Sequence, residues 1–171
     1  MNRFCLFLPS IIFFATSCVN PDSTANPLAY PLVVIDTFHP GAGGWNDTFL
    51  TLVDASGTVL ATDDNGNPVQ ANNLGFSRIT YTDGLAAGDY YIQINNKSGL
   101  GDGYYVIRVL TTDPGATFPT VAAVDEQTDT DDQVDTSGIP TQPVVIVLDQ
   151  VVSRRLFPVA TDVDWFQLVL P

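Results

Sequence analysis

The chain has 171 residues, enough for one domain of ordinary size plus additional segments. It carries 19 Asp and Glu residues against 6 Lys and Arg residues, a formal net charge of −13. So acidic a chain is repelled by a phosphate backbone, which excludes nucleic-acid-binding proteins as a class and favours divalent cations or cationic surfaces as partners.

Residues 1–17 have the pattern of a secretory signal peptide. Arg3 provides a basic start, an apolar run follows at 4–15, and small residues occupy 15–17. The run is shorter than the roughly 20 apolar residues that a membrane-spanning helix needs. We therefore expect export and removal of residues 1–17, which takes the formal charge to −14 because Arg3 is lost.

Cys18 follows the small residues directly. The sequence Ala15-Thr16-Ser17-Cys18 resembles a bacterial lipobox, which implies that Cys18 is the site of lipid attachment and the first residue of the mature chain. The alternative is an ordinary secretory signal followed by a chance Cys. Val19 stands where an Asp would signal inner-membrane retention, so the expected location is the cell envelope, at the outer membrane or cell surface.

Four segments make up the chain from Cys18 onward. Residues 18–27 are polar and Pro-bounded, typical of a flexible tether, and 28–111 alternate short β-rich runs with Gly-rich turns. No sustained helical periodicity occurs there, so the sequence predicts an all-β fold, a β-sandwich of jelly-roll-like form. The expected strands are 32–38, 47–54, 58–62, 77–82, 85–96 and 104–110.

Residues 112–143 form the next segment and read as an acidic, disordered linker, because six of the eleven residues at 125–135 are acidic. Beyond it, 144–171 return to a β pattern. We expect one strand at 144–152, a basic step at 153–158, and a last strand in Asp162–Pro171.

The strand and turn motifs of the first block resemble those of the bacterial pre-peptidase C-terminal (PPC) domain. They are Asp47-Thr48-Phe49-Leu50, the turn 54–57, Asp63-Asp64, Ser77-Arg78-Ile79, Gly88 to Ile92 and Tyr104 to Val109. The resemblance implies a β-sandwich that serves binding or localisation and often accompanies secreted peptidases.

Family members normally begin with a strand of the form D-x-D-W-F, which here stands at the other end, in Asp162 to Phe166. The resemblance therefore implies either a circular permutation or the start of a truncated second domain. The last strands could pair with their own chain, or with a neighbour's in an oligomer formed by strand exchange.

The sequence offers no catalytic set, and we expect a protein that is not an enzyme. His39 is the only histidine, it lies in a Gly-rich turn, and no G-x-S-x-G nucleophile motif accompanies it. Glu126, the only glutamate, lies in the acidic linker, so a pair of glutamates for glycoside hydrolysis is absent.

Two kinds of binding residue are candidates. Calcium prefers oxygen ligands, which Asp63, Asp64 and Asn65 offer in a tight turn, while Asp162 and Asp164 stand where related collagen-binding domains hold calcium. Capping of the turn by Asp side chains is the alternative.

Tyr91 and Tyr105 lie on adjacent expected strands and would stack on a sugar or peptide if they faced outward; cross-strand packing is the alternative. The expected function is a lipid-anchored binding or display module for a protein, polysaccharide or matrix ligand. A truncated remnant of a larger exported protein, such as a secreted peptidase, is the alternative.

Overall fold

A computed structural model describes residues 30–40, 47–67, 75–97, 103–115, 138–156 and 162–171. Within these ranges the secondary structure consists of strands alone. The strands are β1 (Val33–Phe38), β2 (Thr48–Asp54), β3 (Val59–Asp64), β4 (Arg78–Tyr81), β5 (Gly88–Asn96), β6 (Gly103–Leu110), β7 (Val144–Ile146), β8 (Val151–Leu156) and β9 (Val163–Leu170). The predicted signal peptide, the tether, Cys18 and most of the acidic segment lie outside the described residues.

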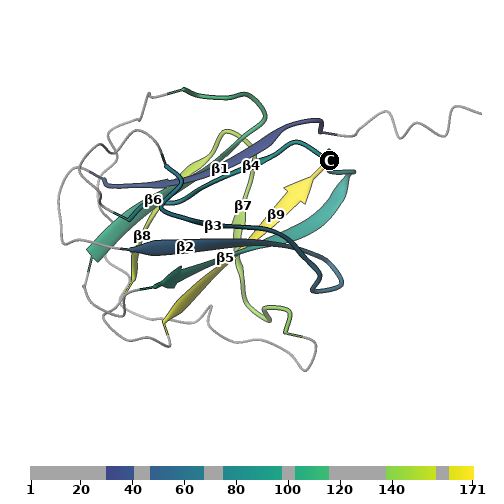
Figure 1. Cartoon of the computed structure of the whole chain (residues 1–171). Coiled ribbons are helices and arrows are strands. Elements are labelled where there is room, and N and C mark those ends of the chain that lie inside the picture. The colour runs from purple at the N-terminus through teal and green to yellow at the C-terminus, as the bar shows by residue number, and fades with distance from the viewer. Residues whose placement is uncertain (1–29, 41–46, 68–74, 98–102, 116–137, 157–161) are drawn as a thin grey trace, which may run out of the picture.

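Two sheets face each other (Figure 1). One has the order β4-β1-β6-β8 and the other the order β3-β2-β5-β9-β7. Every pairing is antiparallel except that of β7 with β9. The predicted all-β sandwich is confirmed.

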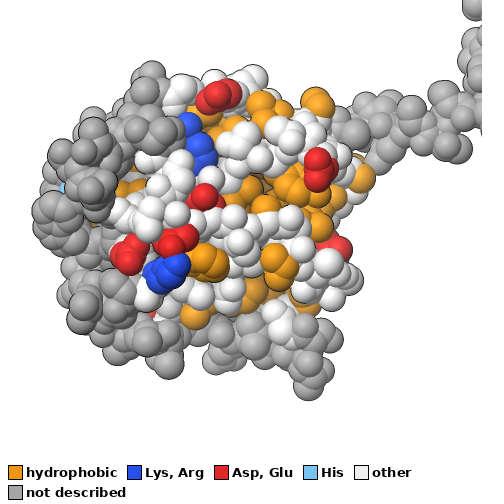
Figure 2. Space-filling view, in the orientation of Figure 1, with side chains coloured by type: hydrophobic (Ala, Val, Ile, Leu, Met, Phe, Trp, Pro, Cys, Tyr) orange, Lys and Arg blue, Asp and Glu red, His pale blue; other side chains and the backbone are white. Residues whose placement is uncertain are grey.

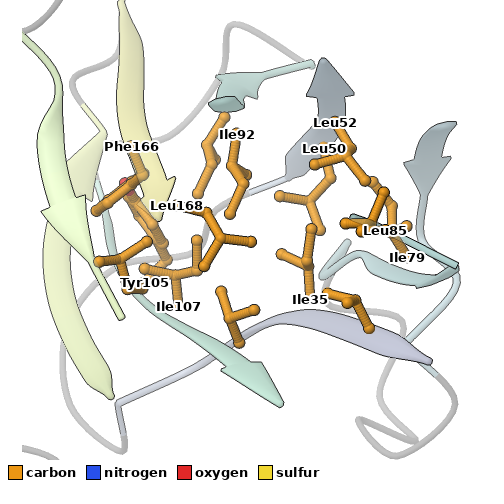
Figure 3. Packing of buried hydrophobic residues seen from close by; sticks show 14 of the residues in the cluster. Ile35, Leu50, Leu52, Ile79, Leu85, Ile92, Tyr105, Ile107, Phe166 and Leu168 are labelled. Carbon is orange, nitrogen blue, oxygen red and sulfur yellow. The ribbon is translucent and has the colours of Figure 1, made fainter. Parts of the chain in front are cut away.

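The core lies between the sheets and follows the alternation of the strands. Ile35 and Ile107 of one sheet meet Leu50, Ile92 and Leu168 of the other, and all five are fully buried (Figure 3). Because successive strand residues point to opposite faces, each of these strands must also present its other residues to the outer face of its sheet.

The C-terminal strands complete both sheets within the same chain. β8 pairs with β6 from Gly103–Leu156 to Arg108–Val151, and β9 pairs with β5 from Gly88–Leu170 to Asn95–Val163. Phe166 and Leu168 of β9 are fully buried in the core. The last strand is therefore an interior strand of its sheet, with β5 on one side and β7 on the other.

The prediction of one strand at 144–152 is wrong. A turn divides this stretch into β7 and β8, which belong to different sheets. Asp149 has φ 62°, and its backbone N–H donates to the Val109 carbonyl at 2.8 Å, while Gln150 N–H donates to the Val147 carbonyl at 3.1 Å. Asp tolerates this left-handed conformation, which reverses the chain in the middle of an apolar run.

The basic residues after this turn also belong to a strand. Arg154 and Arg155 lie in β8 opposite Tyr105 and Tyr104 of β6, and the Arg155 guanidinium lies 5.7 Å from the centre of the Tyr104 ring. The basic step expected at 153–158 is therefore strand as far as Leu156. Cross-strand contacts with aromatic neighbours explain why charged residues are accommodated in a strand here.

Candidate functional site

The two ends of the sandwich differ. Tyr30, the first described residue, pairs with Leu85, and its hydroxyl donates to the Pro171 carbonyl at 3.2 Å. The beginning of the described chain and its C-terminus thus meet at one end, here called the terminal end (Figure 1). β1 and β5 end, and β2 and β9 begin, at the opposite end, here called the loop end.

At the loop end, the outer face of the five-stranded sheet contains a hollow of about 300 Å³. Phe49, Asn95, Asn96 and Lys97 line it. β2 places Phe49 on this face because Leu50 and Leu52 take the core side, and Phe49 lies between Asp64 of β3 and Asn95 of β5. The hollow is therefore formed by residues that adjacent strands hold at fixed positions.

Charge in the hollow is concentrated around Lys97. Its ammonium forms an ion pair with Asp64 and lies 5.3 Å from the centre of the Phe49 ring. The Lys97 backbone N–H donates to the Asp47 carbonyl at 2.8 Å. The pKa of the Asp47 carboxyl is raised, first by burial and then by the negative charge of Asp64, while Lys97 acts in the opposite direction. Asp47 and Asp64 lie beside the hollow and do not line it, but two carboxylates next to one ammonium disfavour anionic ligands there.

Asn95 adds an unsatisfied polar atom. Its side-chain carbonyl oxygen Oδ1 is buried and has no hydrogen-bond partner among the described residues. A buried acceptor without a donor costs about 1–3 kcal/mol. A ligand hydroxyl or N–H that reached this oxygen would recover that cost. An aromatic ring, an amide and an ion pair side by side suit a polar ligand that also has an apolar face.

The five residues predicted to bind calcium do not share one site. Asp63 of β3 and Asp164 of β9 lie in the same row of the sheet, but β2 and β5 stand between them. Three strand spacings put their backbones about 14 Å apart, whereas calcium ligands lie about 2.3–2.6 Å from the ion. Within the described ranges, no three His, Cys, Asp or Glu side chains are grouped as a metal site.

Each half of that predicted set has structural partners. Asp63 caps its turn, because its Oδ2 accepts from the backbone N–H groups of Gly66 and Arg78, both at 2.8 Å. Asn65 has φ 66°, as a tight turn requires, and Asp64 pairs with Lys97. The turn-capping alternative is the one that the geometry favours for Asp63.

Asp162 and Asp164 point into the sandwich, where they are 2% and 1% exposed. Alternation along β9 puts Asp164 on the same side as Phe166 and Leu168, and the Tyr105 hydroxyl donates to its Oδ2. This contact contradicts the prediction that Tyr105 stacks on a ligand. Tyr105 is fully buried, and its neighbour Tyr104 takes the outer face of the sheet.

Tyr91 has the outward orientation that ligand stacking would require. It lies opposite Val53 of β2 and Gln167 of β9, on the outer face of the five-stranded sheet, and is partly buried. It shares that face with Phe49. Ligand stacking by Tyr91 stays a prediction.

His39 and the hydroxyl groups near it are held by packing. The His39 ring lies edge-on to Phe76, with 6.2 Å between ring centres. Thr37 and Thr48 share a hydrogen bond of 2.6 Å between their hydroxyls, and Ser77 N–H donates to the Thr37 hydroxyl at 2.9 Å. These buried contacts link the end of β1 to the start of β2 at the loop end.

Phe49, Asn95 and Lys97 were not among the site residues predicted from the sequence. Alternation predicts that Phe49 lies on the face opposite Leu50. An outward-facing Phe in a strand is common, however, so Phe49 indicates a binding site only when the residues beside it are known. Those neighbours come from β3 and β5, and strand order is not readable from one strand.

No family model, curated protein or solved structure matches this chain. Among the residues that the structure describes, no helix is long and apolar enough to cross a membrane.

Proposed function

We propose that this protein is an exported, lipid-anchored module of the cell envelope that binds a ligand without catalysis through a PPC-like sandwich. The observation that carries the proposal is the separation of the two ends. The described chain begins beside its C-terminus at the terminal end, whereas the hollow opens at the loop end. An anchor attached through Cys18 and the tether 18–27 would leave the hollow facing away from the membrane.

The pairing of β8 and β9 within the chain favours a self-contained module over the alternative, a truncated remnant of a larger exported protein. A remnant of a second domain would carry strands whose apolar faces have no second sheet to pack against. Here Phe166 and Leu168 fill the same core as the strands of the first block.

The ligand class follows from the charges of the hollow. Asp47 and Asp64 outweigh Lys97, and the mature chain carries a formal charge of −14, so an anionic ligand would be repelled. A neutral or cationic polysaccharide, or a basic protein surface, suits an aromatic ring beside an amide. The face shown in Figure 2 has hydrophobic side chains between acidic ones and few basic side chains.

A thermal-shift experiment tests ligand binding. The mature chain carrying Cys18→Ser is melted with a cellohexaose probe, a chitosan hexamer and hyaluronan, which are neutral, cationic and anionic. Binding at 100 times the dissociation constant stabilises by about 2.7 kcal/mol. We expect an upward shift of Tm with the neutral or the cationic probe and none with hyaluronan.

Phe49→Ala should abolish that shift because it removes the ring that lines the hollow. Val59→Ala is the matched control, since Val59 is 56% exposed on β3 of the same sheet. A shift that both variants retain would place the ligand elsewhere. No shift with any of the three probes would argue against polysaccharide binding and leave a protein ligand.

Cys18→Ser tests the anchor separately. In the cell that makes the protein, we expect the unchanged chain in the membrane fraction with a mass increase from its acyl chains. The variant should lack that mass, because serine has no thiol sulfur for lipid attachment. A variant that retained the mass increase would contradict lipidation at Cys18 while leaving the ligand experiment unaffected.

A further inference from the structure

Among the strands that the structure describes, β7 forms an uncharged edge of the five-stranded sheet. The sheet ends in β3 on one side and β7 on the other. Exposed edges usually carry charges that prevent pairing with another chain. β3 carries Asp63 and Asp64, whereas β7 lies in the uncharged run 144–148, VVIVL. One side of β7 pairs with β9, so the other faces away from the sheet.

Exposed apolar side chains gather beside this edge. Val145, Val147 and Val169 are 54%, 48% and 40% exposed. Val145 lies opposite Gln167 and Ile146 opposite Leu168, so the parallel register brings Val147 next to Val169 on the outer face. We call these three residues the valine patch. Val59, the fourth large hydrophobic residue exposed in the described ranges, lies on β3 at the opposite edge of the sheet.

We propose that β7 pairs with β7 of a second copy of this chain, antiparallel across a two-fold axis. Such an interface is isologous, so the edge must be compatible with itself. A register centred on Val145 sets Val144 opposite Ile146 of the other copy and continues the sheet from one copy into the next. β7 itself, Val144–Ile146, carries no charged residue, so no two like charges face each other within the ladder.

The absence of charge on β7 is what favours a second copy as the partner. With a formal charge of −14, two mature chains repel each other wherever their carboxylates approach. A pair of β3 strands would bring four carboxylates, Asp63 and Asp64 of each copy, into one short ladder, whereas a pair of β7 strands brings only valine and isoleucine together. Three valines and a short ladder bury far less than the roughly 1,200 Å² of a stable interface. The dimer is therefore weak, and salt strengthens it by screening the repulsion.

Cross-linking tests the register. The mature chain with Cys18→Ser contains no thiol, because Cys5 leaves with the signal peptide. A single cysteine is then introduced by Val145→Cys or, as the matched control, by Val59→Cys. Opposed residues in an antiparallel pair have Cα atoms about 4.5–5.5 Å apart, within the range for a disulfide. We expect Val145→Cys to form a disulfide-linked dimer at least about tenfold faster than Val59→Cys, because Asp63 and Asp64 of two copies repel each other at the β3 edge.

Sedimentation equilibrium gives an independent measurement on the Cys18→Ser chain. We expect a mass that rises with protein concentration and with salt, and association that Val145→Lys weakens while Val59→Lys leaves it unchanged. Equal cross-linking rates at the two cysteines, or a monomeric mass at every protein and salt concentration, would overturn the proposal. The valine patch would then serve another protein or a lipid surface. Neither measurement depends on the lipid anchor or on the ligand of the hollow.

Discussion

Removal of residues 144–171 should leave a chain that does not fold cooperatively. The deletion takes away β7, β8 and β9, and with them an interior strand of the five-stranded sheet. Phe166 and Leu168 are each fully buried, and full burial of such a side chain contributes about 1.5–3 kcal/mol. β5 would also lose β9, and β6 would lose β8, so each would keep only one of its two neighbours in the sheet. Thermal unfolding of 19–171 and 19–143 measures this, with a sigmoidal transition expected for the longer chain only.

Point substitutions in β9 separate the effect of packing from that of shortening the chain. Leu168→Ala should lower the free energy of unfolding by about 2–5 kcal/mol, because it opens a cavity between the sheets. Val169→Ala is the neighbouring control; Val169 is 40% exposed on the other face, and a change within about 0.5 kcal/mol is expected. Identical melting of 19–171 and 19–143 would show that the C-terminal strands contribute nothing to the fold.

Asp36→Asn should be the most destabilising single change of charge. The Asp36 carboxylate is fully buried between two arginines that lie opposite it on the neighbouring strands. Arg108 donates to Oδ2 through Nη2 at 2.9 Å and through Nε at 3.0 Å, and Arg78 Nη2 donates to the same oxygen at 3.2 Å. The neutral amide removes the buried carboxylate with which both guanidinium groups form ion pairs, a loss of about 3–5 kcal/mol. Urea unfolding at neutral pH measures it.

Two controls give this result its meaning. Asp89→Asn removes an exposed carboxylate from β5 and should change stability by less than about 0.5 kcal/mol. The triple replacement Asp36→Leu, Arg78→Met and Arg108→Met should recover most of the loss, since apolar residues of similar volume often replace a buried ion cluster without penalty. If Asp36→Asn and Asp89→Asn were equally mild, the buried ion cluster would not hold β1, β4 and β6 together.

The class of fold was predictable because it depends on patterns within short stretches of chain. Alternation at 47–54 and 104–110 and the Gly-rich turns between strands indicate an all-β sandwich without any long-range information. The stretch 144–152 was misread for the same reason. Asp149 and Gln150 are the only polar residues in this stretch, and the contact with the Val109 carbonyl of another strand that stabilises their turn cannot be read from local sequence.

Local sequence predicts which residues alternate along each strand, but not which face of a strand the second sheet covers. Tyr104 and Tyr105 had to point in opposite directions, and only the packing of β6 against the other sheet decided that Tyr105 is the buried one. The order of strands in a sheet likewise depends on long-range pairing that no single strand reveals. It separates Asp63 from Asp164 by two strands, joins Asp36 to Arg78 and Arg108, and sets Phe49 beside Asn95 and Lys97. Each of these relations links residues distant in sequence, because neighbours in a sheet are selected by the burial of whole faces.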